Sequence, residues 1–453
     1  MNSSHLGDRL HRTVKLALDS GEASTIEEAE RMFKGYRLAL ALGPEVEHSP
    51  TLQAAVLTAV NTGARAFLGG VFVAGCTDIR LLIPWQGCST LADAIRDLGA
   101  SLMVEIPPGM PVLCFGTPGD VPEGQVRIRV TFEGWCGGVV PLDDERSLPE
   151  QKENVVTGVL CGALGVSEAF QNVRGFPVAG RRAAGLSLWE PGHDWLEPAG
   201  GPPLDWLPNH LWLIGLGHLG QAFLWVLGFL PYADPSTVEL VLQDDDVLVD
   251  ANLSTSPLTT RAMLGQKKAR AMAAWCEERG FRTTVTERRF TSSLRRGERE
   301  PGLALCGVDN AAARAALEEA GFERIIEAGL GAGTSEYLAF QVHTFPGPQV
   351  ARERWGKGDV APLREAHELP EGYRALHEDL DACGLVTLAG RAVGASFVGA
   401  AVASIVIAEA IRMVRGNTYH GVVDGTLRAL SDVEALEMER TVPVVNLGFA
   451  LGE

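Results

Sequence analysis

Apolar and polar positions change character in blocks along the chain, and the clearest series of blocks begins at residue 211. Residues 211–214 form a short apolar run, a Gly-rich turn follows, and residues 221–230 have a helical pattern. A second β-like run covers residues 238–242. This order of strand, turn, helix and strand predicts the start of a doubly wound parallel sheet.

A stretch rich in Pro and Gly divides the chain. Residues 189–210 read WEPGHDWLEPAGGPPLDWLPNH, which suits neither a helix nor a central strand. A chain of 453 residues is also too long for one ordinary hydrophobic core. We therefore expect an N-terminal domain at residues 1–190, a linker at 191–209 and a C-terminal domain at 210–453.

Two segments in the two predicted domains align without a gap. Residues 158–175 and 399–416 share six identities and are otherwise mostly small or apolar: Gly158/Gly399, Glu168/Glu409, Ala169/Ala410, Val173/Val414, Arg174/Arg415 and Gly175/Gly416. This pattern predicts two packing helices, each ended by a glycine, in two related domains. The alternative is a chance likeness of two helices rich in small residues. The first half has no Gly-x-Gly-x-x-Gly turn and no cysteine corresponding to Cys383, so we expect its site to be degenerate.

Composition excludes several classes of function. The formal net charge of −18 without a basic cluster argues against nucleic acid as a partner. The eight cysteines lie far apart, mostly in apolar runs, which suits reduced thiols in the cytoplasm. Residues 1–18 lack the uninterrupted apolar region of a signal peptide, and residues 393–414 suit a buried helix better than a membrane span.

The Gly-rich turn is the first candidate site. Gly215, Gly217 and Gly220 stand between an apolar strand and a helix, where backbone N–H groups can hold phosphate oxygens. Asp244 follows the next strand, where a carboxylate can bind ribose hydroxyls. These features alone fit a nicotinamide-dependent dehydrogenase equally well.

Further motifs separate the two interpretations. The chain continues with Asp244-Asp245-Asp246-Val247, Asn252-Leu253, Gly265-Gln266-Lys267-Lys268, and Val308-Asp309-Asn310 with Arg314. In this order and spacing the residues resemble the family of ubiquitin-activating enzymes and ThiF-type adenylyltransferases. The resemblance covers residues 211 to about 329, and more loosely the helix at 393–416. It implies an α/β fold with two tandem Rossmann-like adenylation domains.

The resemblance also implies a role for each residue. Asp244 would hold the ribose, Asn252 and Lys268 the phosphates, and Asp309 a magnesium ion, while Asp246 also belongs to the nucleotide site. Attack of a carboxylate on a phosphate needs this kind of charge compensation, so Lys268 also has a catalytic role. The structural alternatives are a solvated helix face for Lys267 and Lys268 and a helix cap for Asp309-Asn310.

The sequence departs from the family pattern in two places. The family usually continues Asn-Leu with x-Arg-Gln, whose arginine acts on the phosphates, but Ser254, Thr255 and Ser256 stand here. Arg37 and Arg65 of the other domain are candidates for the missing cation, with a helix-surface salt bridge as the alternative for each. The chain also has no Cys-x-x-Cys pair, so we expect no structural zinc.

Cys383 is the candidate nucleophile. It is the only cysteine of residues 345–390, a stretch without apolar periodicity that reads as a crossing segment outside the main sheet. Family members carry their thioester cysteine on such a segment, and the neighbouring Gly384 leaves room for a peptide tail. A half-buried structural cysteine is the alternative.

Together these features predict an activating enzyme. Mg-ATP would adenylate the C-terminus of a ubiquitin-like protein, Cys383 would take it as a thioester, and a conjugating enzyme would receive it. The layout looks like the activating enzymes of bacterial ubiquitin-like conjugation operons, some of which act in antiviral defence. A homo-oligomer is compatible with this interpretation. A nicotinamide-dependent oxidoreductase and a non-catalytic binding scaffold of the same fold are the alternatives.

Overall fold

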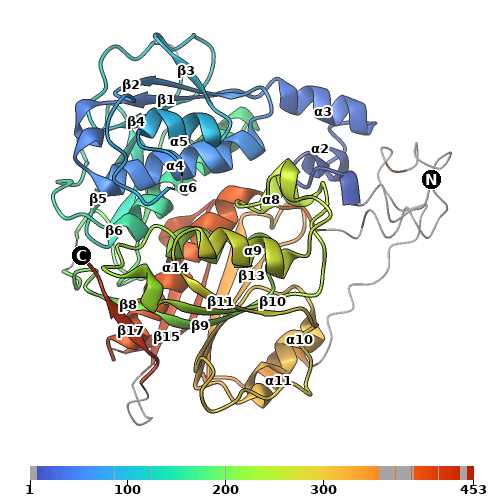
Figure 1. The fold of residues 1–453 in the computed structure, drawn as a ribbon. Coiled ribbons are helices and arrows are strands. Elements are labelled where there is room, and N and C mark those ends of the chain that lie inside the picture. The colour runs from blue at the N-terminus through green and yellow to red at the C-terminus, as the bar shows by residue number, and fades with distance from the viewer. Residues whose placement is uncertain are drawn as a thin grey trace.

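The computed structural model describes residues 8–356, 373, 389, 392–438 and 446–453, except 86, 124, 199 and 417. Within these residues the chain forms two α/β units that lie against each other (Figure 1). Each unit has a central sheet whose first five strands are parallel and whose later strands are antiparallel. The predicted fold class, α/β with two Rossmann-like domains, is confirmed.

The first sheet has the order β3-β2-β1-β4-β5-β6-β7. Its strands are short and mostly buried, which suits the apolar runs that form them. They are β1 (Leu38–Leu42), β2 (Val71–Gly75), β3 (Ser101–Met103), β4 (Val112–Phe115), β5 (Arg127–Glu133), β6 (Cys136–Pro141) and β7 (Ala184–Ser187).

The second sheet repeats this order and adds one strand, giving β11-β10-β9-β12-β13-β14-β15-β16. Its strands are β9 (His210–Ile214), β10 (Glu239–Gln243), β11 (Arg282–Thr286), β12 (Leu303–Cys306), β13 (Arg324–Leu330), β14 (Ala339–Phe345), β15 (Tyr419–Thr426) and β16 (Glu434–Met438). The predicted strands at 211–214 and 238–242 correspond to β9 and β10. A separate two-stranded sheet joins β8 (Trp206–Pro208) to β17 (Phe449–Leu451).

The helices occupy matching places in the two units. Helices α4 (Pro50–Ala66), α5 (Leu91–Asp97) and α6 (Val155–Val173) connect strands of the first sheet, as α7 (His218–Leu227), α9 (Lys268–Glu277) and α14 (Ser396–Val414) do in the second. The other helices are short: α2 (Lys15–Asp19), α3 (Ile26–Lys34), α8 (Asn252–Thr255), α10 (Ala311–Ala315) and α11 (Ala351–Trp355), with 3-10 turns η1 (Pro44–Glu47), η2 (Pro235–Thr237), η3 (Arg261–Met263), η4 (Leu317–Ala320) and η7 (Leu430–Asp432).

The aligned segments form corresponding helices. Helix α6 lies between β6 and β7 in sequence, and α14 lies between β14 and β15. Gly175 and Gly416 follow these helices with φ of +83° and +78°, a conformation that glycine adopts easily and that ends a helix. The predicted pair of glycine-terminated helices is therefore confirmed.

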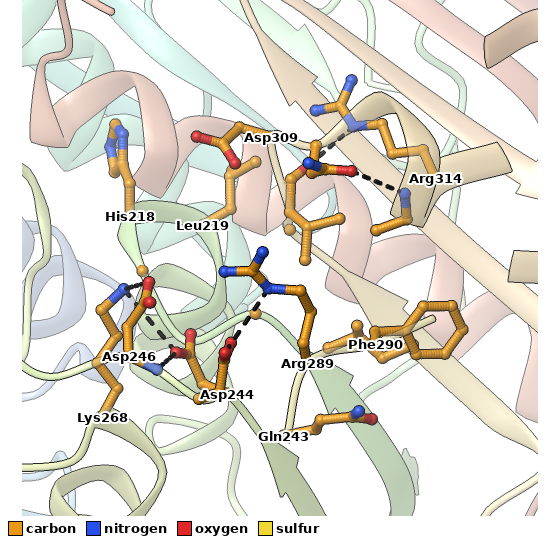
Figure 2. Close-up of a pocket in the computed structure, with 18 of the residues that line it drawn as sticks. His218, Leu219, Gln243, Asp244, Asp246, Lys268, Arg289, Phe290, Asp309 and Arg314 are labelled. Carbon is orange, nitrogen blue, oxygen red and sulfur yellow. Dashed lines mark hydrogen bonds and ion pairs between the residues drawn. The ribbon is translucent and has the colours of Figure 1, made fainter. Parts of the chain in front are cut away.

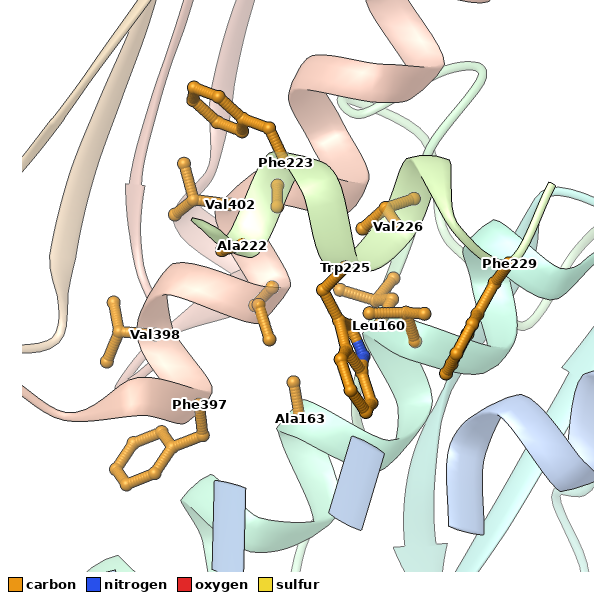
Figure 3. Packing of buried hydrophobic residues seen from close by; sticks show 14 of the residues in the cluster. Leu160, Ala163, Ala222, Phe223, Trp225, Val226, Phe229, Phe397, Val398 and Val402 are labelled. Atoms are coloured by element: carbon orange, nitrogen blue, oxygen red, sulfur yellow. The ribbon is translucent and has the colours of Figure 1, made fainter. Parts of the chain in front are cut away.

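The helices between the two sheets give both units a common core. Figure 3 shows Trp225 of α7 beside Leu160 and Ala163 of α6, with Val398 and Val402 of α14 nearby. The indole N–H of Trp225 donates to Thr58 Oγ1 of α4 at 3.0 Å. The two units therefore share one continuous hydrophobic cluster.

Helix α14 runs through this core. It is the one helix of the described residues that is long and apolar enough to cross a membrane, and 94% of its most apolar window is buried inside the protein. Gly399 allows α7 to approach closely, because a Cβ at this position would lie within 2.4 Å of the His218 ring. The expectation of a buried helix at 393–414 agrees with this packing.

Candidate functional site

A cavity of about 390 Å³ lies at the carboxyl ends of the second sheet's parallel strands. The strand order changes direction between β9 and β12, the place where open α/β sheets bind ligands. The turns after β9, β10, β11 and β12 all contribute to the wall (Figure 2). The cavity gathers most of the predicted site residues: Gly215, Gly217, Asp244, Asp246, Lys268 and Asp309.

The Gly-rich turn has the geometry that its sequence predicts. Gly215 has φ of +83°, and a Cβ on Gly220 would approach Gly215 O within 1.9 Å, so both positions require glycine. A Cβ on Gly217 would meet no atom within 4 Å, because this residue faces the cavity. Gly217 is the N-cap of α7, and none of the side chains that the structure describes forms a capping hydrogen bond there. Free backbone N–H groups at a helix N-terminus attract anions.

Asp244 fixes this turn from the neighbouring strand. Its Oδ2 accepts a hydrogen bond from Leu216 N at 2.7 Å, and its Oδ1 accepts one from Asp246 N at 2.8 Å. The carboxylate therefore orients the Gly-rich turn and the acidic loop after β10 together. It lies on the cavity wall, where the remaining lone pairs can accept further hydrogen bonds.

Lys268 forms ion pairs with carboxylates of the acidic loop. It is only 9% exposed, and its Nζ lies 2.8 Å from Asp246 Oδ2 and 3.9 Å from Asp244 Oδ1. Burial raises the pKa of Asp246, but the hydrogen bond and charge of Lys268, together with Arg289 and Lys267, lower it below its usual value. By contrast Lys267 is exposed and donates to the carbonyl of Asp245 at 2.6 Å. The two adjacent lysines thus differ in burial and direction.

Asp309 and its neighbours form the opposite wall. Asp309 is exposed on the cavity, whereas Asn310 caps α10 by accepting from Ala313 N at 3.0 Å. The alternative role of helix cap, which the sequence offered for Asp309-Asn310, is therefore filled by Asn310. Arg314 also lines the cavity, and its Nε donates to Val308 O at 2.7 Å and lies 3.1 Å from Glu327 Oε1.

The structure does not bring Asn252 to this cavity. Its side chain accepts a hydrogen bond from Val249 N at 2.9 Å, and the residue is absent from the cavity wall. Its assigned contact with phosphate stays a prediction. Thr255 and Ser256, which stand where the family has its arginine and glutamine, are buried.

Neither candidate for the missing cation lines the cavity. Arg65 crosses from α4 to the second unit, where its guanidinium donates to the carbonyls of Leu253, Pro257 and Thr259. Arg37 is also absent from the cavity wall. Arg65 therefore joins the two units at the loop after α8 and does not point toward the site.

Two arginines that sequence reasoning missed do reach the cavity. Arg288 and Arg289 follow β11, and Figure 2 shows Arg289 extending between the acidic loop and the side of Asp309. The Arg289 Nε lies 3.6 Å from Asp245 Oδ2. Gln243 holds this loop by donating to Arg288 O at 3.1 Å, and the buried Phe290 anchors its other end. The available signal was an arginine pair at the carboxyl end of a parallel strand.

His218 contributes an uncharged ring to the site. It is the first residue of α7 and lies beside α14, where a Cβ on Gly399 would approach the His218 Nε2 within 2.4 Å. Burial, with a smaller contribution from the charge of Arg65, lowers the pKa of His218 to about 4, although hydrogen bonds from the ring to the backbone of Ser396 and Ala395 raise it. The ring is therefore neutral near pH 7 and links α7 to the start of α14.

The donor types at the cavity suit a hard cation. Oxygen ligands of Asp244, Asp245 and Asp246 lie within 4.8 Å of one another, and Asp309 lines the same cavity. Carboxylate oxygens are ligands that Mg²⁺ accepts. Because acidic loops also occur without a metal, the predicted magnesium role of Asp309 stays a prediction.

The predicted nucleophile Cys383 lies outside the described residues. Of the seven cysteines that the structure describes, five are buried, and Cys76 and Cys88 are half-buried. Burial raises the pKa of both half-buried thiols, and nearby carboxylates raise it further. None of these seven residues lines the cavity.

Comparison with known proteins agrees with the two-unit architecture. The family described as BilD N-terminal domain matches residues 37–188, and the family described as BilD C-terminal domain matches residues 207–417. The curated protein "Bacterial E1-like protein BilD" of Collimonas sp. (strain OK412) is 40% identical over 428 residues, which cover 94% of this chain and 93% of that protein.

Solved structures give a much weaker likeness. E. coli MccB is 11% identical, with a TM-score of 0.33, over 69% of this chain and 93% of that chain. The E. coli tRNA N6-threonylcarbamoyladenosine dehydratase TcdA in complex with ATP is 15% identical, with a TM-score of 0.29, over 45% of this chain and 84% of that chain. Likenesses of this size say nothing of what this chain binds. The extensive identity to the Collimonas protein shows that the chain belongs to the BilD family of bacterial E1-like proteins.

Proposed function

We propose that this chain adenylates the C-terminus of a ubiquitin-like protein with Mg-ATP and then takes it as a thioester on Cys383. The observation that carries the first step is the cavity that joins the uncapped N-terminus of α7 to Lys268 and Asp309. A carboxylate oxygen of the protein tail attacks the α-phosphorus of ATP. The bond from the α-phosphorus to the bridging oxygen breaks, and pyrophosphate leaves with its electron pair.

The charges of the cavity suit this chemistry. The backbone N–H groups at Gly217 and the Lys268 ammonium would lie beside the triphosphate of ATP. Their positive charge would offset the repulsion between the triphosphate and the attacking carboxylate. Magnesium, held by Asp309 with help from the acidic loop, would neutralise part of the phosphate charge. Arg288 and Arg289 add positive charge to a site in which Thr255 stands at the position of the family's arginine.

The second step rests on the position of Cys383 in the chain. Ala392 lines the cavity and comes nine residues after Cys383, so a fully extended chain limits their separation to about 30 Å. A thiolate at Cys383 would attack the carbonyl of the adenylate, and the carbon–oxygen bond to AMP would break. A conjugating enzyme would then receive the ubiquitin-like protein by exchange of one thioester for another.

Lys268→Ala tests the nucleotide site. We expect it to remove ATP–pyrophosphate exchange with a co-purifying ubiquitin-like protein, and to remove the rise in melting temperature on adding Mg-ATP. Lys267→Ala is the matched control, because this neighbouring lysine is exposed and binds only a backbone carbonyl. Equal loss in both variants, or in neither, would contradict the assignment.

The same melting experiment separates the alternatives. Stabilisation by NADH but not by Mg-ATP would indicate an oxidoreductase, which shares the Gly-rich turn and Asp244 but gives Lys268 and Asp309 no role. Stabilisation by Mg-ATP without pyrophosphate exchange or AMP release would indicate a binding scaffold. Mg-ATP stabilisation together with exchange supports the proposed enzyme.

A further inference from the structure

A buried lysine outside the nucleotide site joins distant parts of the chain. Lys15 on α2 has a side chain that is only 1% exposed, and its Nζ binds Asp19 at 2.6 and 2.8 Å. The same ammonium donates to Ala389 O at 3.0 Å and lies 5.4 Å from the centre of the Tyr373 ring. The Tyr373 hydroxyl in turn donates to Asp19. This group of Lys15, Asp19, Tyr373 and Ala389 is called the α2 anchor below.

Neighbouring residues of the N-terminal segment contact the second unit as well. Asp8 O accepts from Ala251 N at 2.7 Å, and Arg12 N donates to Ser254 Oγ at 3.1 Å. Thr13 Oγ1 donates to Gly394 O at 2.9 Å, next to the cavity residue Val393. Figure 1 shows α2 close to α8. Residues 8–19 therefore belong to the first unit by sequence but pack on the second unit beside its cavity.

The α2 anchor encloses Cys383 in sequence. Tyr373 comes ten residues before Cys383, and Ala389 comes six residues after it. Since an extended residue spans at most about 3.6 Å, Cys383 lies within roughly 22 Å of Ala389. The two ends of the stretch that carries the predicted nucleophile are thus held by one buried ion pair.

A buried ion pair is a costly way to stabilise a helix of five residues. The removal of two charges from water can cost more than their attraction returns, and exposed pairs at the same spacing contribute little. Lys15 also makes contacts with both ends of the Cys383 stretch, which an apolar side chain could not make. These contacts give the Lys15 ammonium a role beyond the stabilisation of its own helix.

We propose that the α2 anchor holds Tyr373 and Ala389, the residues that flank Cys383 in sequence, to the N-terminal segment beside the nucleotide cavity, with Lys15 as the positioning residue. Lys15 touches no nucleotide and takes no part in the chemistry. It fixes where the stretch leaves and rejoins the fold. The consequence for catalysis rests on the proposed function, whereas the anchoring itself does not.

Lys15→Met tests the anchor, with Tyr373→Phe as a milder variant that removes only the hydroxyl. Lys34→Met is the matched control, because Lys34 forms an exposed ion pair with Glu30 at the same helical spacing. Trypsin cleavage is followed by mass spectrometry after Arg374, the residue next to Tyr373, and after Arg391, two residues beyond Ala389. The shift of melting temperature by Mg-ATP reports the cavity.

We expect cleavage at these two sites to rise at least about tenfold in Lys15→Met and about threefold in Tyr373→Phe, with the Mg-ATP shift retained. Lys34→Met should change neither quantity. With the co-purifying ubiquitin-like protein, thioester formation should fall about tenfold while pyrophosphate exchange stays within about twofold.

Three results would overturn the proposal: unchanged cleavage in a folded Lys15→Met, equal loss of exchange and thioester, or the same changes in Lys34→Met. If Lys15→Met does not fold, Tyr373→Phe decides by the same criteria. A wild-type protein without exchange would count against the proposed function, and the cleavage comparison would still decide the anchor.

Discussion

The turns after β1 and after β9 occupy the same place in the two sheets, yet side chains fill the space at the first turn whereas the second turn lines the cavity. In the second unit, two residues separate β9 from Gly217, the N-cap of α7, and open space lies beside this glycine. In the first unit, η1 follows β1, and the Glu45 carboxylate accepts from Thr117 N at 2.9 Å after β4. A Cβ on Gly116 would lie 2.4 Å from the Glu45 Oε2.

Carboxylates of the first unit also occupy its helix N-terminus. Glu153 Oε2 accepts hydrogen bonds from Ser49 Oγ and Thr51 N, each at 2.9 Å, at the start of α4. These are the groups that would hold phosphate in an active unit. The first unit thus keeps the fold, but its own carboxylates accept hydrogen bonds from the groups at this turn and helix start. Under the proposed function, the turn rather than the sheet therefore distinguishes the unit that binds a nucleotide.

Gly217→Asp should make the turn after β9 resemble the turn after β1 by adding a carboxylate. The new carboxylate would lie in the cavity at the N-terminus of α7, where it would repel phosphate. We expect the affinity for Mg-ATP to fall at least about 100-fold, or roughly 2.7 kcal/mol. Isothermal titration calorimetry measures this directly.

Gly217→Asn is the control for this change, since it has the same shape and backbone cost without the charge. A Cβ at this position meets no atom within 4 Å, so both variants should fold. Equal binding by the aspartate and asparagine variants would show that charge at the turn does not distinguish the two units.

Glu150 tests the electrostatics of the filled unit. Burial raises the pKa of its carboxyl to about 7, and the nearby Glu45 and Glu153 raise it further, against a hydrogen bond from Thr131 and the charge of Arg129. The folded protein therefore keeps a proton that the unfolded chain loses near pH 4.5, so the free energy of unfolding falls as pH rises from about 4.5 to 7.

Glu150→Gln cannot titrate and should lack this loss of stability. We expect it to be about 2 kcal/mol more stable than wild type at pH 8 and nearly equal at pH 4.5, after allowance for partial exposure. Urea unfolding at both pH values measures the difference, with Glu145→Gln of the same loop as control. A constant difference across this range would mean that Glu150 titrates normally.

The cavity site of the second unit could be predicted from the sequence because its residues lie in short motifs. The Gly-rich turn, Asp244 and Lys268 lie in short motifs, and the carboxyl ends of parallel strands meet at one edge of a sheet. The two matched helices were predictable for the same reason. Glu168 and Glu409 hold matching places in them, and each accepts a backbone N–H, from Gly180 and His420 respectively.

The remaining features depend on side-chain directions that no motif encodes. Asn252 turns toward Val249 N, and Arg65 toward carbonyls of the second unit, although both residues have types suited to phosphate. Arg289 reaches the cavity only because Gln243 and Phe290 fix its loop. The α2 anchor joins residues more than 350 positions apart, as in the Tyr373–Asp19 hydrogen bond with a separation of 354.

The smallest predicted effect concerns Glu153, whose carboxylate accepts two hydrogen bonds at the start of α4. Glu153→Ala should cost about 1 kcal/mol of stability, because Thr51 N and the Ser49 hydroxyl lose an acceptor at a helix N-terminus. The same variant should leave Mg-ATP binding unchanged, since the second unit holds the cavity. Thermal melting with and without Mg-ATP measures both quantities, and Glu47→Ala is a control because Glu47 forms only an exposed contact with His48.

If Glu153→Ala instead gained a second Mg-ATP site, the Glu153 carboxylate would be the only feature that keeps the first unit inactive. A loss of ATP binding would show that the two units communicate through their shared core.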